Sequence, residues 1–240
     1  MLDHLKELRQ EVYAANMMLF EYGLAVLTWG NVSGIDKNRE YVVIKPSGVN
    51  YRELTPENMA VVNLRGETAE DSLKPSSDTP THLELYKAYK EIGGVCHTHS
   101  LYATSFAQAP GGVIEALGTT HADYFNGKIP QTRKMKKSEI EKDYEKNTGL
   151  VIIEALEKAK KTPSEMPAVT VRSHGPFTFG KNAAESVEHS MILESAAHMA
   201  FNTKMLAAFA VLGGCENMQN SLLSKHFDRK HGKNAYYGQR

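Results

Sequence analysis

The first residues of the chain follow a helical pattern of apolar side chains. The positions that recur at steps of three and four residues are Leu5, Leu8, Val12, Ala15, Leu19 and Tyr22. This spacing places them on one side of an α-helix, with the charged residues on the other. The pattern therefore predicts an amphipathic helix that packs through its apolar side and ends near Gly23.

Short segments with strand-like patterns follow. Residues 31–35 and 41–45 flank a polar turn, and residues 59–64 form a third apolar run. Residues 94–99 come after two glycines and contain valine and threonine, while residues 169–173 alternate between apolar and polar side chains. Such segments are typical of β-strands, and we expect the first three to form a hairpin or meander.

Two further helices are indicated by the residues at their starts. Thr79 precedes Pro80, which predicts a helix with proline in its first turn that reaches about Glu91. Asn182 and Glu185 resemble a capping box, and helical periodicity continues from there up to Gly213. This second helix is expected to be the longest of the chain.

The chain shows no internal division. Two charge-rich stretches, 134–145 and 157–161, have helical length, and we expect them to form solvated helix faces. No repeat, proline-rich linker or low-complexity segment interrupts the 240 residues. We therefore expect one domain of mixed helices and strands over 1–240.

The charge balance narrows the class of partner. The 28 lysines and arginines equal the 28 aspartates and glutamates, so no positive excess is present for a nucleic acid or an anionic membrane. Two cysteines, Cys96 and Cys215, form no Cys-x-x-Cys pattern and are too few for a disulfide framework. Since no signal peptide or membrane-spanning run is indicated either, we expect a cytoplasmic protein.

Histidines supply the first candidate chemistry. His97 and His99 stand two residues apart on the predicted strand 94–99, where alternate side chains share a face. His174 lies where a Gly-Pro turn ends the predicted strand 169–173. Three histidines with an open position are typical of a catalytic zinc site, whereas structural zinc sites usually rely on thiolates. For the pair alone, the alternative is one hydrogen-bonded core histidine and one surface histidine.

Two polar loops offer groups that suit a phosphate. Ser76 and Ser77 precede the predicted helix at Thr79, where hydroxyl and backbone N–H groups converge, and Asp78 can add a carboxylate to a metal. Residues 45–48 provide a lysine, a hydroxyl and a glycine that lets the backbone approach a ligand. The alternatives are helix capping for the first loop and an ordinary turn for the second.

Taken together, these motifs resemble the class II sugar-phosphate aldolase and epimerase family. The resemblance runs nearly end to end and includes Ser-Ser-Asp-Thr-Pro-Thr-His at 76–82 and His-Thr-His-Ser at 97–100. The other segments that carry it are 28–33, 45–49, 119–125, 147–149, 172–177 and 235–239. The fold that it implies is a single domain with a central, mainly antiparallel β-sheet flanked by helices.

The resemblance also implies a set of binding residues. It assigns zinc, or another divalent metal, to His97, His99 and His174, with Asp78 as a fourth contact. The residues that it places around the sugar phosphate are Asn31, Lys45, Ser47, Gly48, Ser76 and Ser77.

Two more residues match the acid and base of the family, namely Asp123 and Tyr237, with Tyr236 as the alternative to the latter. The family builds its sites between subunits of a homotetramer, so the tail 216–240 is expected to contribute to an intersubunit site. The positions that match other residues near the site are Thr119, Glu145, His226 and Arg229.

The activity implied by the resemblance is the interconversion of L-ribulose 5-phosphate and D-xylulose 5-phosphate, as in arabinose catabolism. The hydrogen on C4 is not acidic, so the C3–C4 bond breaks in a retro-aldol step and re-forms on the opposite face, which needs an acid/base group on each face. The nearest alternative is an aldolase for a ketose 1-phosphate such as L-fuculose 1-phosphate, in which glutamate replaces Asp78. The other alternative, a non-catalytic binding module of the same fold, fits poorly with the three histidines.

Overall fold

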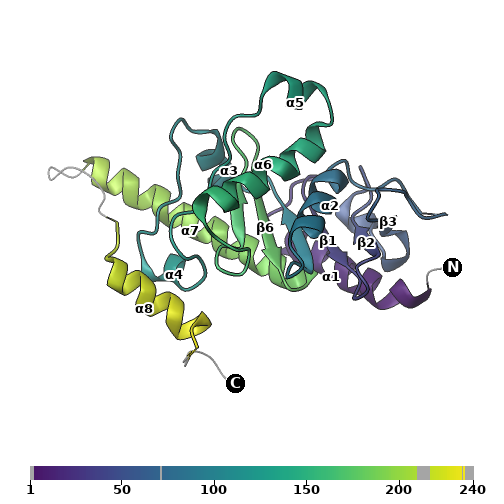
Figure 1. Cartoon of the computed structure of the whole chain (residues 1–240), viewed down its shortest axis with the longest axis horizontal. Helices are drawn as coiled ribbons and strands as arrows, with labels where there is room; N and C mark the ends of the chain where they lie inside the picture. Colours follow the sequence, from purple (N-terminus) through teal and green to yellow (C-terminus); the bar gives the residue numbers. More distant parts are fainter. Residues whose placement is uncertain (1–2, 71, 210–216, 234, 236–240) are drawn as a thin grey trace.

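A six-stranded antiparallel sheet forms the centre of the computed structural model (Figure 1). The structure describes residues 3–70, 72–209, 217–233 and 235. The strands are β1 (Asn31–Ile35), β2 (Tyr41–Ile44), β3 (Ala60–Asn63), β4 (Gly94–His97), β5 (Ala168–Thr170) and β6 (Pro176–Gly180). Their order in the sheet is β3-β2-β1-β4-β6-β5, and every neighbouring pair is antiparallel.

Helices cover the sheet and extend beyond it. The α-helices are α1 (Lys6–Glu21), α2 (Thr79–Ala88), α3 (Leu101–Gln108), α4 (Thr119–Ala122), α5 (Lys137–Glu141), α6 (Tyr144–Ala159), α7 (Ala183–Phe209) and α8 (Asn220–His231). Short 3-10 helices are η1 (Asp3–Leu5), η2 (Tyr51–Glu53) and η3 (Pro56–Asn58). No helix of the described residues is long and apolar enough to cross a membrane.

The side chains of the strands pack alternately into two apolar cores, one on each face of the sheet. Val43 and Cys96 belong to the core that α1 and the start of α7 cover, whereas Val42 and Val95 belong to the core under α2, α3 and α6. Successive strand residues point to opposite faces, so burial on both faces explains why the strands read as short apolar runs. The structure thus confirms the predicted fold class of a single domain with an antiparallel sheet between helices.

The predicted elements are found, with differences at their ends. The first helix and the strands at 31–35, 41–45 and 59–64 are confirmed to within a residue or two. The helix expected to reach Glu91 ends at Ala88. There the Arg39 guanidinium donates to the carbonyls of Tyr86, Tyr89, Lys90 and Ile92, which stabilises an early end.

The capping signal before α7 is confirmed in part. The backbone N–H of Glu185 donates to the Asn182 side chain at 2.8 Å, as in a capping box. The Glu185 carboxylate, however, accepts from the N–H of Lys181 rather than from that of Asn182. At 27 residues α7 is the longest described helix, and Gly213, its predicted limit, lies outside the described residues.

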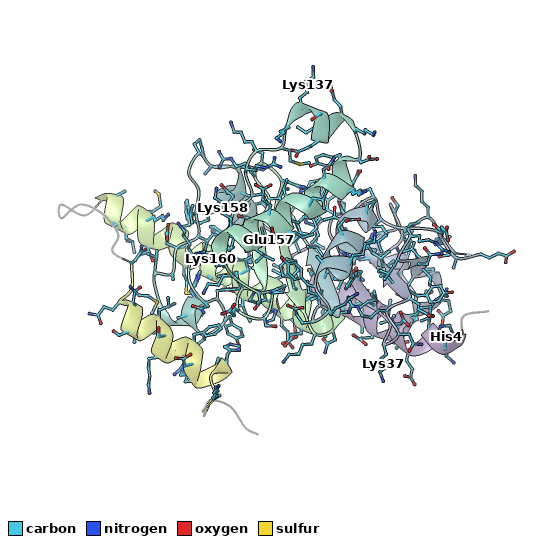
Figure 2. The ribbon with its side chains drawn as sticks, in the orientation of Figure 1. His4, Lys37, Lys137, Glu157, Lys158 and Lys160 are labelled. Atoms are coloured by element: carbon cyan, nitrogen blue, oxygen red, sulfur yellow. The ribbon has the colours of Figure 1, made fainter. Side chains whose placement is uncertain are left out.

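The charge-rich stretches are solvated, as expected. Figure 2 shows Lys137, Lys158 and Lys160 on the surface of the molecule. The stretch 134–145 is not one helix, because Asp143 has a left-handed conformation (φ 56°) that separates α5 from α6. A non-glycine residue in this region interrupts a helix, which local charge patterning does not reveal.

Candidate metal centre

The centre begins at the end of β4, where His97 occupies the last strand position. His97 lies opposite Asn31 of β1 and Phe177 of β6, and its side chain is buried, with 1% of its surface exposed. Its Nδ1 lies 2.9 Å from the carbonyl oxygen of Pro176. Because a carbonyl only accepts, Nδ1 must be the donor in this contact, so Nε2 is the nitrogen that can face a metal.

His99 lies just beyond the strand, contrary to the prediction that 94–99 would form a single strand. The chain turns after His97 to begin α3 at Leu101, and the first N–H groups of that helix, on Tyr102 and Ala103, donate to the Glu194 carboxylate of α7 at 2.8 and 2.9 Å. His99 nevertheless points back to the strand end, with its Nε2 3.1 Å from that of His97.

His174 reaches the same place from the turn between β5 and β6. The Val171 N–H donates to the Gly175 carbonyl at 2.8 Å, which closes the turn that the Gly-Pro pair predicted. Gly175 lies so close to the segment after β4 that a Cβ at this position would be 2.6 Å from the backbone oxygen of Thr98. Glycine is therefore needed for the turn to reach the segment between His97 and His99.

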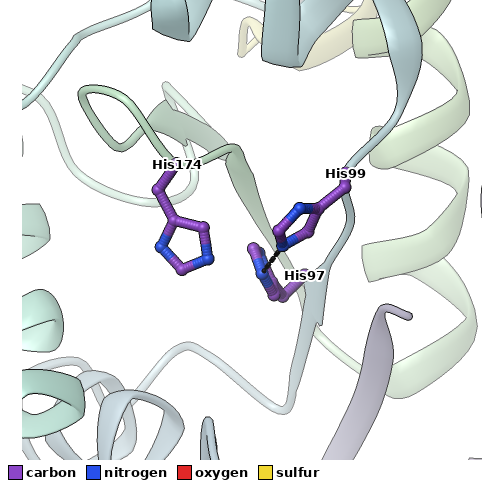
Figure 3. A group of neighbouring side chains, drawn as sticks. All are labelled: His97, His99 and His174. Carbon is purple, nitrogen blue, oxygen red and sulfur yellow. Dashed lines mark hydrogen bonds between the residues drawn. The ribbon is translucent and has the colours of Figure 1, made fainter. Parts of the chain in front are cut away.

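The three imidazoles converge on one point (Figure 3). One nitrogen from each of His97, His99 and His174 lies within 4.8 Å of the others, and in Figure 3 all three rings face a common centre. Ligand nitrogens about 2.0–2.1 Å from a tetrahedral ion lie roughly 3.3 Å apart. The 3.1 Å between the Nε2 atoms of His97 and His99 fits two ligands of one ion. The described residues of this group include no thiolate.

Burial favours the metal-binding form of the rings. Desolvation, followed by the neighbouring imidazoles, lowers the pKa of His174 to about 4. Desolvation also lowers the pKa of His99, and His97 adds to this shift. Since only a neutral imidazole ligates a metal, these rings are ready to bind one at neutral pH.

Asp78 lies beside the centre without belonging to the set of converging nitrogens. Its carboxylate accepts from the Asn31 amide at 2.7 Å, and its side chain makes no capping hydrogen bond to α2. Burial acts to raise the pKa of Asp78, but His97, His82 and the Asn31 amide outweigh it, so the pKa lies below its usual value. This carboxylate stays ionised close to the imidazoles, and simple helix capping does not account for it.

The two polar loops lie side by side. The Ser47 N–H donates to the Lys74 carbonyl at 2.9 Å, and the Ser76 N–H donates to the Lys45 carbonyl at 3.0 Å. Ser47, Gly48 and Ser77 are exposed and Ser76 is half-buried, so both loops present polar groups at one surface. The structure therefore brings the predicted phosphate-binding loops together.

Lys45 is oriented differently from its neighbours. Its side chain is buried, and Nζ donates to the Val49 carbonyl at 2.7 Å and to those of Thr28 and Pro46 at 3.4 Å. Burial lowers the pKa of Lys45 to about 8. This ammonium ties the loop to the segment before β1, and its predicted contact with a ligand stays a prediction.

Asp123 belongs to a second polar group, formed by α4 and α8. Its carboxylate accepts from His226 Nδ1 at 3.0 Å and from Arg229 Nη2 at 2.7 Å. Burial acts to raise the pKa of Asp123, but Arg229 and His226 together outweigh it, so the pKa lies below its usual value. Tyr236 and Tyr237 lie outside the described residues.

The four further positions that resemble residues near the family's site lie in two parts of the structure. His226 and Arg229 contact Asp123, and Thr119 begins the helix that ends beside it. Glu145 lies in the first turn of α6, where its backbone carbonyl accepts from Thr81 Oγ1 at 2.6 Å.

Three further residues beside the imidazoles were not identified from the sequence. The Tyr144 hydroxyl lies 3.4 Å from His174 Nδ1, the Trp29 ring centre lies 6.2 Å from that of His99, and Glu194 holds the helix after His99. Trp29 lies within the family-like segment 28–33, which was a usable signal. Tyr144 and Glu194 have no local signal, because their roles depend on contacts with distant parts of the chain.

The chain matches a known protein family in sequence and several solved structures in fold. The sequence pattern described as the class II aldolase and adducin N-terminal domain matches residues 10–201. An L-fuculose 1-phosphate aldolase structure is 20% identical, with a TM-score of 0.76 over 93% of this chain and 95% of that one. The L-fuculose-1-phosphate aldolase of Thermus thermophilus is 23% identical (TM-score 0.67; 85% and 98%). The sugar-phosphate aldolase of Thermotoga maritima is 22% identical (TM-score 0.66; 85% and 97%).

Proposed function

The chain belongs to the class II aldolase and adducin family, and from this premise we propose that it is a metal-dependent sugar-phosphate enzyme, specifically an L-ribulose-5-phosphate 4-epimerase. It interconverts L-ribulose 5-phosphate and D-xylulose 5-phosphate. The observation that carries the proposal is the convergence of His97, His99 and His174 on one point beside the ionised Asp78. A module that only binds another protein has no need of three imidazoles arranged around one open position.

Zinc is the proposed ion. When bound, a divalent cation supplies Lewis-acid stabilisation of the negative charge that develops on the ketose oxygens as the C3–C4 bond breaks. His97, His99 and His174 hold it, and Asp78 offers a carboxylate from the start of α2. The Asn31 amide fixes that carboxylate through its hydrogen bond of 2.7 Å.

The other residues control the substrate and its protons. The paired loops bind the phosphate through Ser47, Gly48, Ser76 and Ser77. This contact keeps glycolaldehyde phosphate in the site while its aldehyde group rotates between cleavage and re-addition. Asp123 and Tyr237 exchange protons with the C4 oxygen, one on each face.

We also propose that the enzyme is a homotetramer with sites between subunits. Asp123 lies in a group with His226 and Arg229 on α4 and α8, apart from the three-imidazole set of its own chain. In this arrangement, Asp123 and the tail of one subunit serve the metal bound by its neighbour. Light scattering of the purified protein tests the subunit number.

The decisive experiment is incubation of zinc-loaded protein with L-ribulose 5-phosphate, followed by NMR. We expect D-xylulose 5-phosphate to accumulate to an equilibrium with the substrate. Accumulation of dihydroxyacetone and glycolaldehyde phosphate alone would show cleavage without epimerisation. No reaction with this pentulose would refute the proposed substrate.

A second candidate function is cleavage of a ketose 1-phosphate. Structures described as L-fuculose 1-phosphate aldolases share the fold over most of both chains, and this likeness fits an aldolase as well as an epimerase. The aspartate at position 78, where the family's aldolases carry glutamate, favours the epimerase. L-fuculose 1-phosphate should therefore be tested beside the pentulose, with product identified in the same way.

Replacing Asp123 with asparagine is expected to lower kcat by about 10²-fold or more, because the amide cannot accept a proton from the C4 hydroxyl. Zinc content should stay unchanged, since Asp123 lies outside the three-imidazole set. Steady-state kinetics and elemental analysis measure the two quantities. Asp228→Asn, an exposed change on α8, is the matched control. A parallel loss of zinc and activity in Asp123→Asn would contradict the acid/base role.

A further inference from the structure

The three imidazoles are held in different ways. His97 is fixed by the sheet and by the Pro176 carbonyl at 2.9 Å. His174 lies on a turn outside the strands, and among the described residues the side chain that forms a hydrogen bond with its ring is that of Tyr144, whose hydroxyl lies 3.4 Å from Nδ1. The orientation of His174 therefore depends on a contact from a separate element, α6.

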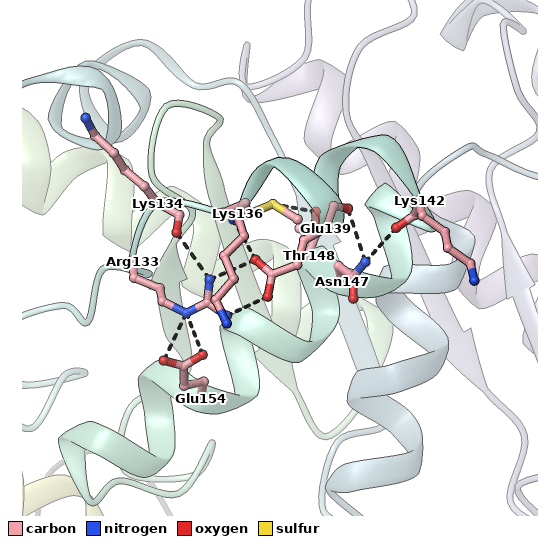
Figure 4. A network of polar contacts seen from close by, with 9 residues as sticks. Arg133, Lys134, Lys136, Glu139, Lys142, Asn147, Thr148 and Glu154 are labelled. Atoms are coloured by element: carbon pink, nitrogen blue, oxygen red, sulfur yellow. Dashed lines mark hydrogen bonds and ion pairs between the residues drawn. The ribbon is translucent and has the colours of Figure 1, made fainter.

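The start of α6, where Tyr144 lies, is firmly anchored (Figure 4). The Asn147 amide donates to the carbonyls of Lys142 at 2.7 Å and Glu139 at 3.1 Å, across the break between α5 and α6. The Glu139 carboxylate in turn accepts two hydrogen bonds of 2.8 Å from Arg133. Arg133 also pairs with Glu154 on the same helix at 2.9 Å.

The same helix is packed closely on α2. A Cβ at Gly149 would lie 2.8 Å from the Glu84 Cβ and 2.9 Å from the Thr81 carbonyl, so no larger residue permits this approach. Thr81 Oγ1 also donates to the Glu145 carbonyl at 2.6 Å. Because α2 begins directly after Asp78, these contacts fix Tyr144 relative to that carboxylate as well as to His174.

The two nitrogens of His174 face opposite ways. In Figure 3 one ring nitrogen points toward His97 and His99, and the other points away from them. The hydroxyl of Tyr144 is next to Nδ1. A phenol oxygen that accepts from Nδ1–H leaves the lone pair on Nε2, directed at the other two rings.

We propose that Tyr144 is a positioning residue for the metal centre, whose hydroxyl holds His174 in the tautomer and orientation that present Nε2 to the ion. This inference rests on the proposed metal-dependent function. It extends that function to a residue that need not contact substrate or metal. Partners of this kind fix ring direction and ligand basicity, and their loss typically weakens metal binding by about 10–100-fold.

The test is Tyr144→Phe, which removes the hydroxyl and keeps the ring. We expect the zinc Kd, measured by competition with a chromogenic chelator, to rise about 10-fold or more. The visible spectrum of the cobalt-substituted protein should change, because the ligand field at His174 changes. The matched control is Tyr89→Phe, which removes a tyrosine hydroxyl at the C-terminal end of α2. This variant should leave both the zinc Kd and the cobalt spectrum unchanged. The thermal midpoint of the metal-free protein should be similar in all three proteins.

A double-mutant cycle separates positioning from a general structural effect. In a His174→Ala background, the additional change Tyr144→Phe should leave the weakened zinc Kd unchanged, because its target is absent. An equal further loss in that background would overturn the inference, and so would an unchanged Kd in the single variant. Failure of the wild-type protein to bind zinc would refute the proposed metal function itself, and the inference with it.

Discussion

Replacing His99 with alanine is expected to remove the metal and nearly all catalysis, while the fold persists. His99 contributes one of the three converging nitrogens, so the variant retains two imidazoles for the ion. It is also the exposed member of the set and lies outside the strands, so its loss leaves no core cavity. Loss of several kcal/mol of Lewis-acid stabilisation corresponds to a fall in kcat of about 10³-fold or more.

Dialysed protein should be analysed for zinc and assayed with L-ribulose 5-phosphate under one set of conditions. His198→Ala provides the matched control, since His198 is an exposed histidine that stacks on Tyr102 and lies outside the converging set. That control should keep its zinc and most of its activity. Full zinc content and normal turnover in His99→Ala would contradict the proposed centre.

Replacing Gly94 with alanine is expected to prevent stable folding. A Cβ at this position would lie 2.1 Å from the Asn182 oxygen and 2.6 Å from the Ala183 nitrogen, both of them backbone atoms. Backbone at the start of α7 cannot move aside as a flexible side chain does, so β4 and α7 must separate. We expect the free energy of unfolding to fall by at least about 3 kcal/mol, or no folded protein to be recovered.

Urea denaturation followed by circular dichroism measures this effect. Gly118→Ala is the control, because a Cβ at Gly118 meets nothing within 4 Å and its backbone is extended. An unfolding midpoint for Gly94→Ala equal to that of the wild type would contradict the close approach of β4 and α7.

The elements of the fold were predictable where their signals are local. Proline after Thr79 and the Asn182 side chain act within the first helical turn, and the apolar spacing before Gly23 repeats along a single helix; the structure confirms the elements that they predict. The end of α2 was not predictable, because the residue that stabilises it, Arg39, lies 47 residues before Tyr86. The order of strands is equally non-local, since β4 pairs with β1 and β6 rather than with β3.

The candidate site divides in the same way. Spacing identified His97 and His99, although the predicted reason was partly wrong: His99 reaches the centre after the strand has ended. His174 joins them because β4 pairs with β6, a fact that the histidines themselves do not encode. From its residue type alone, Asp78 could equally have capped the helix that follows it. The structure shows that its carboxylate accepts a hydrogen bond from Asn31 and makes no capping hydrogen bond to α2.

Two polar residues show the limit of loop patterns. The segment 45–48 predicts a lysine near an anion, and the pattern of the loop does not reveal that its ammonium donates to three backbone carbonyls. The resemblance assigned Asp123 a proton-transfer role, and the residues around it do not reveal that α8 brings His226 and Arg229 onto its carboxylate. An element distant in sequence decides the environment of Asp123, whereas two of the three carbonyls at Lys45, those of Pro46 and Val49, come from its own loop.

The order of the strands also determines when, during synthesis, the three proposed metal ligands can first come together. β4 lies between β1, which leaves the ribosome before it, and β6, which leaves long after it. A nascent chain that stops short of position 174 has two of the imidazoles but not the turn that supplies the third. The three proposed ligands therefore come together only after the β5–β6 segment has emerged, so any metal ion that they hold is bound late in synthesis.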